Sequence, residues 1–336
     1  MGGAAVKVGK LSAAELRARV LPYRGAARRE VLVGPGVGVD SAVLDLGGDV
    51  CVVSSDPITG AGQGAGRLAV IVATNDVAAH GARPVGVVVV LLLPEGAALD
   101  TLEALMREID AEARRLGVAV LGGHTEITSR VKDAVVVVTA IGRAARDRFV
   151  SAHDARPGDF LVVTKGVGLE GTAILATDFG APLSAVLGED VVKRAAAFTQ
   201  ELSVVEEALA AVAAGARAMH DITEGGLLGA VEEMCEAAGA GCELWEDRIP
   251  VREETAAICR HLGLDPLGLL GSGSLLVAAP DGEALVAALK RAGVPAACIG
   301  RLVDKADGKR IRGRDGHWRP LAAYPQDELW RFLESQ

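Results

Sequence analysis

The sequence predicts two domains that each mix strands with helices, in the α+β and α/β classes. A chain of 336 residues is long enough for two domains. Strand-like and helix-like segments alternate in both halves, and half of the residues are hydrophobic, which supplies material for two cores. The halves meet in a charged stretch, residues 144–158, that contains Pro157 and Gly158. We therefore expect an N-terminal domain at 1–148 and a C-terminal domain at 149–336.

The N-terminal half begins with a helical lead-in over residues 1–30, in which Ser12 is the expected cap of a helix from Ala13. Asp56 and Pro57 are expected to end a strand, because proline cannot donate to a strand ladder. The apolar run 85–93 predicts a strand buried on both faces. Further strands are expected at 31–33, 43–46, 50–55, 118–121 and 134–142, helices at 66–81 and 100–116, and a flexible glycine-rich loop at 58–66.

The C-terminal half repeats the alternation of strands and helices. Apolar runs that end at glycine or polar residues predict the strands, and amphipathic spacing predicts the helices. The expected strands are 160–164, 216–219, 243–245, 275–278 and 297–303, and the expected helices are 190–214, 227–238, 253–262 and 283–292.

Composition argues against several classes of partner. A formal charge of -9 repels phosphate backbones, and 3% aromatic residues leave few base-stacking side chains, so we expect no nucleic acid. The first residues lack the apolar core of a signal peptide, and the run 85–93 is too short for a membrane helix. Five scattered cysteines without a C-x-x-C pair indicate reduced thiols in a cytoplasmic protein.

The segment 66–81 is apolar almost all round, which predicts a buried helix. Asn75 and Asp76 nevertheless lie side by side in its middle. A buried carboxylate is costly unless it is hydrogen-bonded or bound to a cation. Asp76 is therefore the first candidate for a site residue.

Further acids follow predicted strands, on or beside glycine-rich turns at Gly34, Gly122, Gly166 and Gly225. Carboxylates and phosphate oxygens are the ligands that Mg²⁺ prefers. Each residue also has an ordinary structural alternative: Asp56 as a turn former, segment 34–42 as a mobile turn, His124 and His220 as partners of turn backbone, and Lys165 as a solvated strand end. The repeated placement, together with Asn75 and Asp76, favours a shared magnesium and phosphate site.

Eight short motifs stand in a fixed order along nearly the whole chain. They are VGPGVGVDSA (33–42), SDP (55–57), ATNDVA (73–78), GARP (81–84), GGHTE (122–126), MHDITEGG (219–226), IPV (249–251) and LDP (264–266). In this order they resemble the AIR-synthetase-like (PurM-like) ATP-binding superfamily, and the nearest pattern is that of the hydrogenase maturation factor HypE. Thiamine-monophosphate kinase and selenophosphate synthetase are other members.

The resemblance implies a PurM-like fold and a homodimer. An N-terminal ferredoxin-like sheet domain would pair with its copy into a shared barrel, and a C-terminal α/β domain would follow. It also implies ATP with Mg²⁺, and transfer of the phosphoryl group to an oxygen that then leaves. By motif match the metal-site acids are Asp40, Asp56, Asp76 and Asp221, and no catalytic residue is assigned. The implied nucleotide-binding residues are Gly36, Gly38, Asn75, Gly122, Gly123, Thr125, Glu126 and Lys165.

Two departures from the HypE pattern bear on activity. HypE ends in a cysteine that carries a carbamoyl group, whereas this sequence ends Leu333-Glu334-Ser335-Gln336 and its last cysteine is Cys298. Several relatives place an aspartate where this chain has His124, and a neutral imidazole is a poor ligand for Mg²⁺. We therefore expect a changed metal number or phosphate geometry, and a partner or carrier that supplies the acceptor.

The expected function is that of a HypE-like, ATP- and Mg²⁺-dependent enzyme. It would activate an amide-type or other oxygen of a small or carrier-bound substrate. One alternative is a catalytically silent nucleotide-binding assembly factor that docks a maturation protein. Another is a small-molecule kinase like thiamine-monophosphate kinase, with which Gly271-Ser272-Gly273 is compatible. The sequence leaves the acceptor and the turnover of ATP open.

Overall fold

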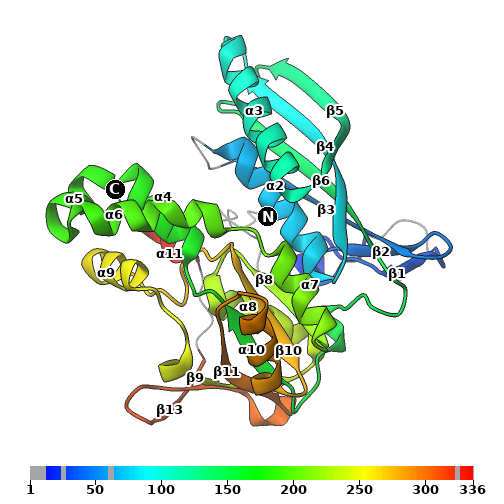
Figure 1. The fold of residues 1–336 in the computed structure, drawn as a ribbon, viewed down its shortest axis with the longest axis vertical. Helices are drawn as coiled ribbons and strands as arrows, with labels where there is room; N and C mark the ends of the chain where they lie inside the picture. Colours follow the sequence, from blue (N-terminus) through cyan, green and yellow to red (C-terminus); the bar gives the residue numbers. More distant parts are fainter. Residues whose placement is uncertain (1–12, 24–27, 60–63, 322–325, 336) are drawn as a thin grey trace, which may run out of the picture. The chain divides into compact units, whose positions relative to one another are not determined.

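A computed structural model describes residues 13–23, 28–59, 64–321 and 326–335. The chain divides into two compact units (Figure 1). The N-terminal unit comprises Arg28–Gly34 and Asp40–Phe149, and the C-terminal unit comprises residues 13–23, Pro35–Val39 and the chain from Val150. A boundary at 148/149 stays a prediction, and it does not anticipate that 13–23 and 35–39 pack with the later residues. The proposed cap Ser12 and residues 60–63 of the expected loop lie outside the described ranges.

The N-terminal unit is a six-stranded sheet with two helices on one face (Figure 1). The strands are ordered β1-β2-β3-β6-β4-β5 and are antiparallel except for β4 beside β5. Its elements are β1 (Val31–Val33), β2 (Ala42–Asp45), β3 (Val50–Ile58), α2 (Ala65–Ala79), β4 (Arg83–Pro94), α3 (Leu99–Leu116), β5 (Ala119–Thr128) and β6 (Val135–Ala144).

Strand β4 is buried on one face only. Its residues alternate between buried and partly or fully exposed, and Val85 is 48% exposed. The prediction that β4 is buried on both faces is therefore wrong within a single chain. Helices α2 and α3 both cover the same side of the sheet (Figure 1). Apolar side chains of β4 thus lie partly exposed on the other side.

Helix α2 is held closely against α3. A Cβ on Gly66 would lie 2.6 Å from the carbonyl oxygen of Leu105, so only glycine permits this approach. The Glu108 carboxylate accepts the backbone N–H groups of Gly64 at 3.2 Å and Gly66 at 3.0 Å. The first N–H groups of α2 are thus bound by a side chain of α3. This contact fixes the helix that carries Asn75 and Asp76.

Strand β3 does not end at Asp56, as the proline predicted. It continues through Pro57 to Ile58 and stays paired with β6, where Pro57 faces Val137. On its other side β2 pairs only with Val50–Val53 of β3. Beyond Val53 that side of β3 has no pairing with β2, so a residue without an N–H is tolerated there.

The predicted glycine turn at 122–126 is instead part of β5, which is an edge strand. The pairing with β4 shifts register between Val87 and Val88, and Gly123 has a φ of +152°. A Cβ on Gly123 would lie 1.7 Å from the Val89 carbonyl oxygen. Glycine here therefore serves close strand pairing at an irregular register, and the prediction of a turn is wrong.

Gly123→Ala is expected to destabilise the N-terminal unit by about 3 kcal/mol, because the new methyl group forces β5 away from β4. Gly96→Ala is the matched control. Gly96 also has a positive φ, +84°, but a Cβ there would have nothing within 4 Å, so we expect a loss of only about 1 kcal/mol. Urea unfolding checks both values, and equal losses would contradict the argument.

The C-terminal unit is built on a seven-stranded sheet in the order β13-β12-β9-β11-β7-β10-β8. All described neighbours are antiparallel except β12 beside β9. The strands are β7 (Phe160–Thr164), β8 (Ala218–Ile222), β9 (Gly241–Trp245), β10 (Ser274–Ala279), β11 (Ala296–Val303), β12 (Lys309–Arg312) and β13 (Trp318–Pro320). The helices are α1 (Ala13–Arg19), α4 (Leu169–Asp178), α5 (Gly180–Leu187), α6 (Glu189–Ala196), α7 (Val205–Ala213), α8 (Gly226–Ala238), α9 (Glu253–Leu262), α10 (Gly282–Arg291) and α11 (Glu328–Leu333).

Most predicted elements of this half are present, with two differences. The helix expected at 190–214 is interrupted by a 3-10 segment, Ala197–Glu201, between α6 and α7. Asp221 lies within β8 rather than on the turn after it. All five cysteines are free thiols. Within the described ranges, every helix is too short or too polar to span a lipid bilayer.

Candidate functional site

Two of the predicted metal-site carboxylates meet at one hydroxyl group in the N-terminal unit. Ser54 Oγ lies 2.6 Å from Asp76 Oδ2 and 3.2 Å from Asp56 Oδ2. The same Oγ lies 3.1 Å from the backbone oxygen of Asp40. Because Asp56 Oδ2 and Asp76 Oδ2 both contact the same Oγ, the two carboxylate oxygens lie close to each other. We call Asp40, Ser54, Asp56 and Asp76 the Ser54 cluster.

Strand geometry and helix packing bring these groups together. Ser54 and Asp56 are two residues apart on β3, so they point to the same face of the sheet. That face is covered by α2, whose buried Asp76 reaches Ser54. Asn75, the neighbouring residue on α2, is also fully buried.

One hydroxyl group lies within reach of three acceptor oxygens in the Ser54 cluster. A hydroxyl group carries one hydrogen, so Ser54 donates to one of its three acceptor oxygens at a time. Two carboxylates at this separation repel each other unless a cation is between or beside them. Their oxygens are hard ligands of the kind that Mg²⁺ takes, usually one or two carboxylates with phosphate oxygens and water. The donor set therefore fits the predicted ion.

Asp221, the fourth predicted acid, belongs to the C-terminal unit. It is 2% exposed and pairs across the sheet with Leu275 of β10. Its neighbour His220 lies with Nε2 2.6 Å from Glu233 Oε2 of α8. The imidazole of His220 is thus bound by a side-chain carboxylate. The structural alternative in the sequence analysis is a hydrogen bond from this histidine to the backbone of a turn.

The predicted nucleotide-binding glycines Gly36 and Gly38 also pack in the C-terminal unit. Gly38 has a φ of +69°, and a Cβ there would lie 2.6 Å from the Glu233 carbonyl oxygen. A Cβ on Gly36 would lie 3.0 Å from Val39 and 3.5 Å from the His153 ring. Close backbone approach explains Gly38, whereas Gly36 lies against side chains. A role of either glycine in nucleotide binding stays a prediction.

The remaining predicted positions of the N-terminal unit lie along exposed β5. His124 Nε2 is 3.6 Å from Glu126 Oε2, and both side chains are more than half exposed. Gly122, Gly123 and Thr125 belong to the same edge strand. A nucleotide contact from these residues stays a prediction.

Lys165 is enclosed by the C-terminal unit. Its Nζ donates to the backbone oxygens of Glu201 at 2.7 Å and Ser203 at 2.9 Å, and lies 3.0 Å from Glu207 Oε2. Three acceptors use all three N–H groups of an ammonium. Burial lowers the pKa of Lys165 and raises the pKa of Glu207. A phosphate contact by Lys165 would have to replace one of these bonds.

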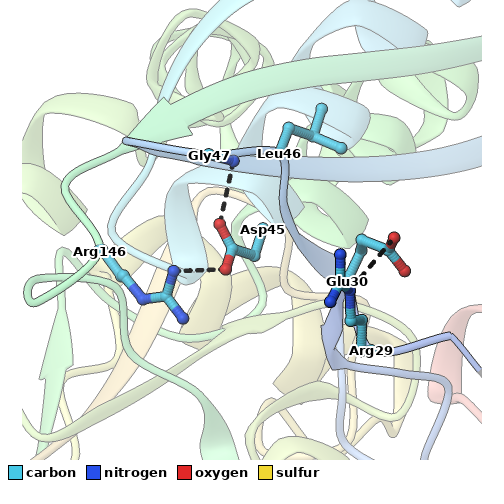
Figure 2. Close-up of a pocket in the computed structure, with 6 residues that line it drawn as sticks. All are labelled: Arg29, Glu30, Asp45, Leu46, Gly47 and Arg146. Carbon is cyan, nitrogen blue, oxygen red and sulfur yellow. Dashed lines mark hydrogen bonds and ion pairs between the residues drawn. The ribbon is translucent and has the colours of Figure 1, made fainter.

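A cavity of about 610 Å³ opens beside β1 and β2, and its charges are paired within the chain (Figure 2). Asp45 accepts the Gly47 N–H at 3.1 Å and an N–H of Arg146, and these bonds hold the pKa of Asp45 below its usual value. Glu30 binds Arg28 through both carboxylate oxygens. The cavity therefore offers no open carboxylate pair among its described residues, which are Arg29, Glu30, Asp45, Leu46, Gly47 and Arg146.

Comparison with known proteins assigns the chain to a family. The family model for the N-terminal domain of AIR synthase related proteins matches residues 38–144, and that for the C-terminal domain matches 156–312. Carbamoyl dehydratase HypE of Rhodobacter capsulatus is 34% identical over 283 residues, which cover 82% of this chain and 81% of the relative. The chain belongs to the HypE branch of the AIR synthase related family.

Solved HypE structures share the fold of this HypE-branch chain. HypE of Escherichia coli has a TM-score of 0.72 and 27% identity, over 91% of this chain and 96% of the other. A HypE crystallised with ATP has a TM-score of 0.67 and 26% identity, over 96% and 97% of the two chains. The PurM-like fold and the family predicted from the motifs are thus confirmed.

Ser54 is not identified from the sequence alone, although its hydroxyl group contacts both Asp56 and Asp76. In the sequence Ser54 is only part of a predicted strand. The signal that could identify it is the two-residue spacing to Asp56, because a polar residue on the buried face of a strand needs a partner. Asp56 and Asp76 themselves, predicted to be neighbours, do converge on this residue.

Proposed function

We propose that this protein binds ATP with Mg²⁺ and uses it to dehydrate a carbamoyl group carried on a thiol. The Ser54 cluster carries the proposal, because it gathers two carboxylates at one buried hydroxyl. Membership in the HypE branch supports the choice of reaction, since the relative from Rhodobacter capsulatus is named a carbamoyl dehydratase.

Each residue of the proposed site has a distinct task. Asp56 and Asp76 would hold Mg²⁺, with Ser54 keeping their carboxylates in position. When bound, Mg²⁺ neutralises phosphate charge and so favours phosphoryl transfer. Asp40 would add a ligand, and Asn75 of the same unit would contact the nucleotide. Asp56 and Asp76 stand on a strand and a helix rather than on loops, which suits a site that acts by positioning.

The reaction balances with ATP as the phosphoryl donor. The carbamoyl oxygen takes the γ-phosphoryl group, the C–O bond then breaks with phosphate as the leaving group, and the nitrogen loses two protons. The product is a nitrile on sulfur, with ADP and phosphate. The carbamoyl group would be carried by a thiol on a maturation-protein partner, and its oxygen is the phosphoryl acceptor.

Incubation with Mg–ATP and a carbamoylated cysteine peptide tests the proposal. We expect release of ADP and phosphate, and loss of one water from the peptide in its mass spectrum. Absence of nucleotide binding in the presence of millimolar Mg²⁺ would reject the whole proposal. Binding and ATP turnover without peptide dehydration would reject only the carbamoyl acceptor.

Ser54→Ala is expected to weaken the binding of Mg–ATP about tenfold, because the carboxylates lose the group that orients them. Ser55→Ala is the matched control. Ser55 is the next residue, is exposed, and bonds Thr139 Oγ1 at 2.8 Å. Titration calorimetry with Mg–ATP compares the variants. Equal affinity of Ser54→Ala and the original chain would remove Ser54 from the site.

A second candidate function is nucleotide binding without turnover, as in an assembly factor. The feature that favours it is His124 on β5, because a neutral imidazole is a poor ligand for Mg²⁺. This candidate expects tight Mg–ATP binding, no ADP release, and a stable complex with a maturation protein. The peptide assay above separates it from the enzyme.

We also propose a homodimer that covers the exposed apolar surface and the edge of the N-terminal sheet. An exposed edge strand is a template for pairing, and β5 exposes Leu121 at 58% and Ile127 at 52%. Val85 of β4 adds a further exposed apolar side chain at 48%. Light scattering after size-exclusion chromatography should give twice the chain mass. A monomer at micromolar concentration would reject the dimer.

A further inference from the structure

One buried carboxylate near the end of the described chain ties three segments of the C-terminal unit together. Asp327 Oδ2 accepts the Gly225 N–H at 2.6 Å. Its Oδ1 accepts the N–H groups of Leu270 at 3.2 Å and Leu329 at 2.8 Å. Asp327 is 2% exposed, so these bonds replace its contacts with water. Gly225 and Leu270 lie 102 and 57 residues away from Asp327 along the chain.

The segments joined by Asp327 also fit closely by themselves. The turn 223–226 and the helix that follows it exchange backbone bonds with 267–271: Gly271 N–H binds the Thr223 oxygen at 3.1 Å, and Leu228 N–H binds the Leu267 oxygen at 3.2 Å. A Cβ on Gly226 would lie 2.6 Å from the Leu267 oxygen. The turn therefore has little room to shift without moving its neighbours.

This turn directly follows β8, and β8 carries Asp221. Thr223 comes two residues after Asp221, and Gly225 leads into α8. Pairing with β10 holds the Asp221 backbone on one side, and the turn is the segment that holds the end of β8 next to it. In this turn the carboxylate of Asp327 holds the Gly225 N–H.

We infer that Asp327 is a positioning residue for nucleotide binding: it fixes the 223–226 turn and thereby holds Asp221 in register. The inference rests on the proposed function, because it concerns the binding of Mg–ATP. Asp327 would not touch the nucleotide. Its carboxylate acts through the Gly225 N–H and the backbone that leads back to β8.

Glu328 supplies a matched control at the next position. It is also buried, at 4% exposed, and its carboxylate accepts the Asp265 N–H at 3.0 Å and pairs with Arg331. Loss of either acid should loosen the docking of α11. The partners of Glu328 lie in α11 and at Asp265 rather than in the turn 223–226, so only Asp327 should affect nucleotide binding.

The test compares Asp327→Asn with Glu328→Gln by calorimetric titration with Mg–ATP, with thermal unfolding alongside. Burial raises the pKa of Asp327 to about 6, so assays at about pH 8 keep it ionised. We expect both variants to melt at lower temperature than the original chain. Asp327→Asn should bind Mg–ATP about tenfold more weakly, and Glu328→Gln within about twofold of the original. Amide exchange at 223–226 should rise only in Asp327→Asn.

Unchanged binding by Asp327→Asn, or an equal loss in both variants, would overturn the inference. An original chain that binds no Mg–ATP would overturn the proposed function as well, and this is measured before any variant is compared. If Asp327→Asn does not fold, the milder pair Asp327→Glu and Glu328→Asp replaces it. The same difference in affinity is expected between them, and its absence would overturn the inference.

Discussion

Asp76→Asn is expected to raise the Kd for Mg–ATP about 100-fold, roughly 3 kcal/mol of binding free energy. The change removes a negative charge from the Ser54 cluster and leaves the shape of the side chain almost unaltered. Ser54 can still donate to the remaining oxygen, so the contact between β3 and α2 persists. We expect the unliganded variant to remain folded, because the side chain keeps its shape and its contact with Ser54.

Asp100→Asn is the control for Asp76→Asn. Asp100 lies exposed in the first turn of α3, in the same unit, and the substitution changes the net charge equally. Titration with Mg–ATP should give a Kd for Asp76→Asn about 100-fold higher than that for Asp100→Asn. Similar affinities would show that the effect comes from overall charge, and would remove Asp76 from the proposed metal site.

Glu170→Gln is expected to stabilise the protein at about pH 8 by up to about 3 kcal/mol. Glu170 is buried in the first turn of α4, and burial raises its pKa from the ordinary value of 4.5 to about 7, against the opposing hydrogen bond from Ser272. Above that pKa the folded chain must hold this acid ionised away from water. Glutamine matches the neutral form and avoids that cost.

The sign of the pH dependence follows from the raised pKa of Glu170. Between about pH 4.5 and 7 the folded state binds a proton that the unfolded state has released. The contribution of Glu170 to folding stability is therefore fully present below about pH 4.5 and is lost as the pH rises through about 7. The raised pKa of Asp327, about 6, acts in the same direction.

Urea unfolding at several values between about pH 5 and 8 checks this prediction. The difference in unfolding free energy between Glu170→Gln and the original chain should grow with pH up to about 7 and then level off. Glu206→Gln, the same change at an exposed acid of α7, is the control for loss of a carboxylate. Parallel curves for Glu170→Gln and the original chain would contradict a buried, titrating Glu170.

Helices with clear amphipathic spacing are predictable almost to the residue. The helix expected at 253–262 is α9, and that expected at 100–116 is α3 with one residue added. Periodicity is local, so it survives whatever packs against the helix. Helix α2 also lies close to its expected range, 66–81, and its buried Asp76 is the strongest single indication of a site in the sequence.

Strand limits are less predictable, because they depend on neighbours that the sequence does not name. Pro57 sits inside β3 because the pairing of β2 stops at Val53. Gly123 sits inside β5 because it must approach the Val89 oxygen. Ser54 is not recognisable in the sequence either, because its contact with Asp76 forms only when α2 packs over β3. Residues that meet across elements need the fold before they can be grouped.

The enclosure of Lys165 makes it a reporter of local opening. Amine-reactive reagents attack an accessible, uncharged nitrogen, and the lowered pKa of Lys165 favours that form. Its side chain, however, is 9% exposed and every N–H has an acceptor. Chemical labelling of this lysine therefore measures how often residues 201–207 separate from the end of β7, on the time scale of the labelling reaction.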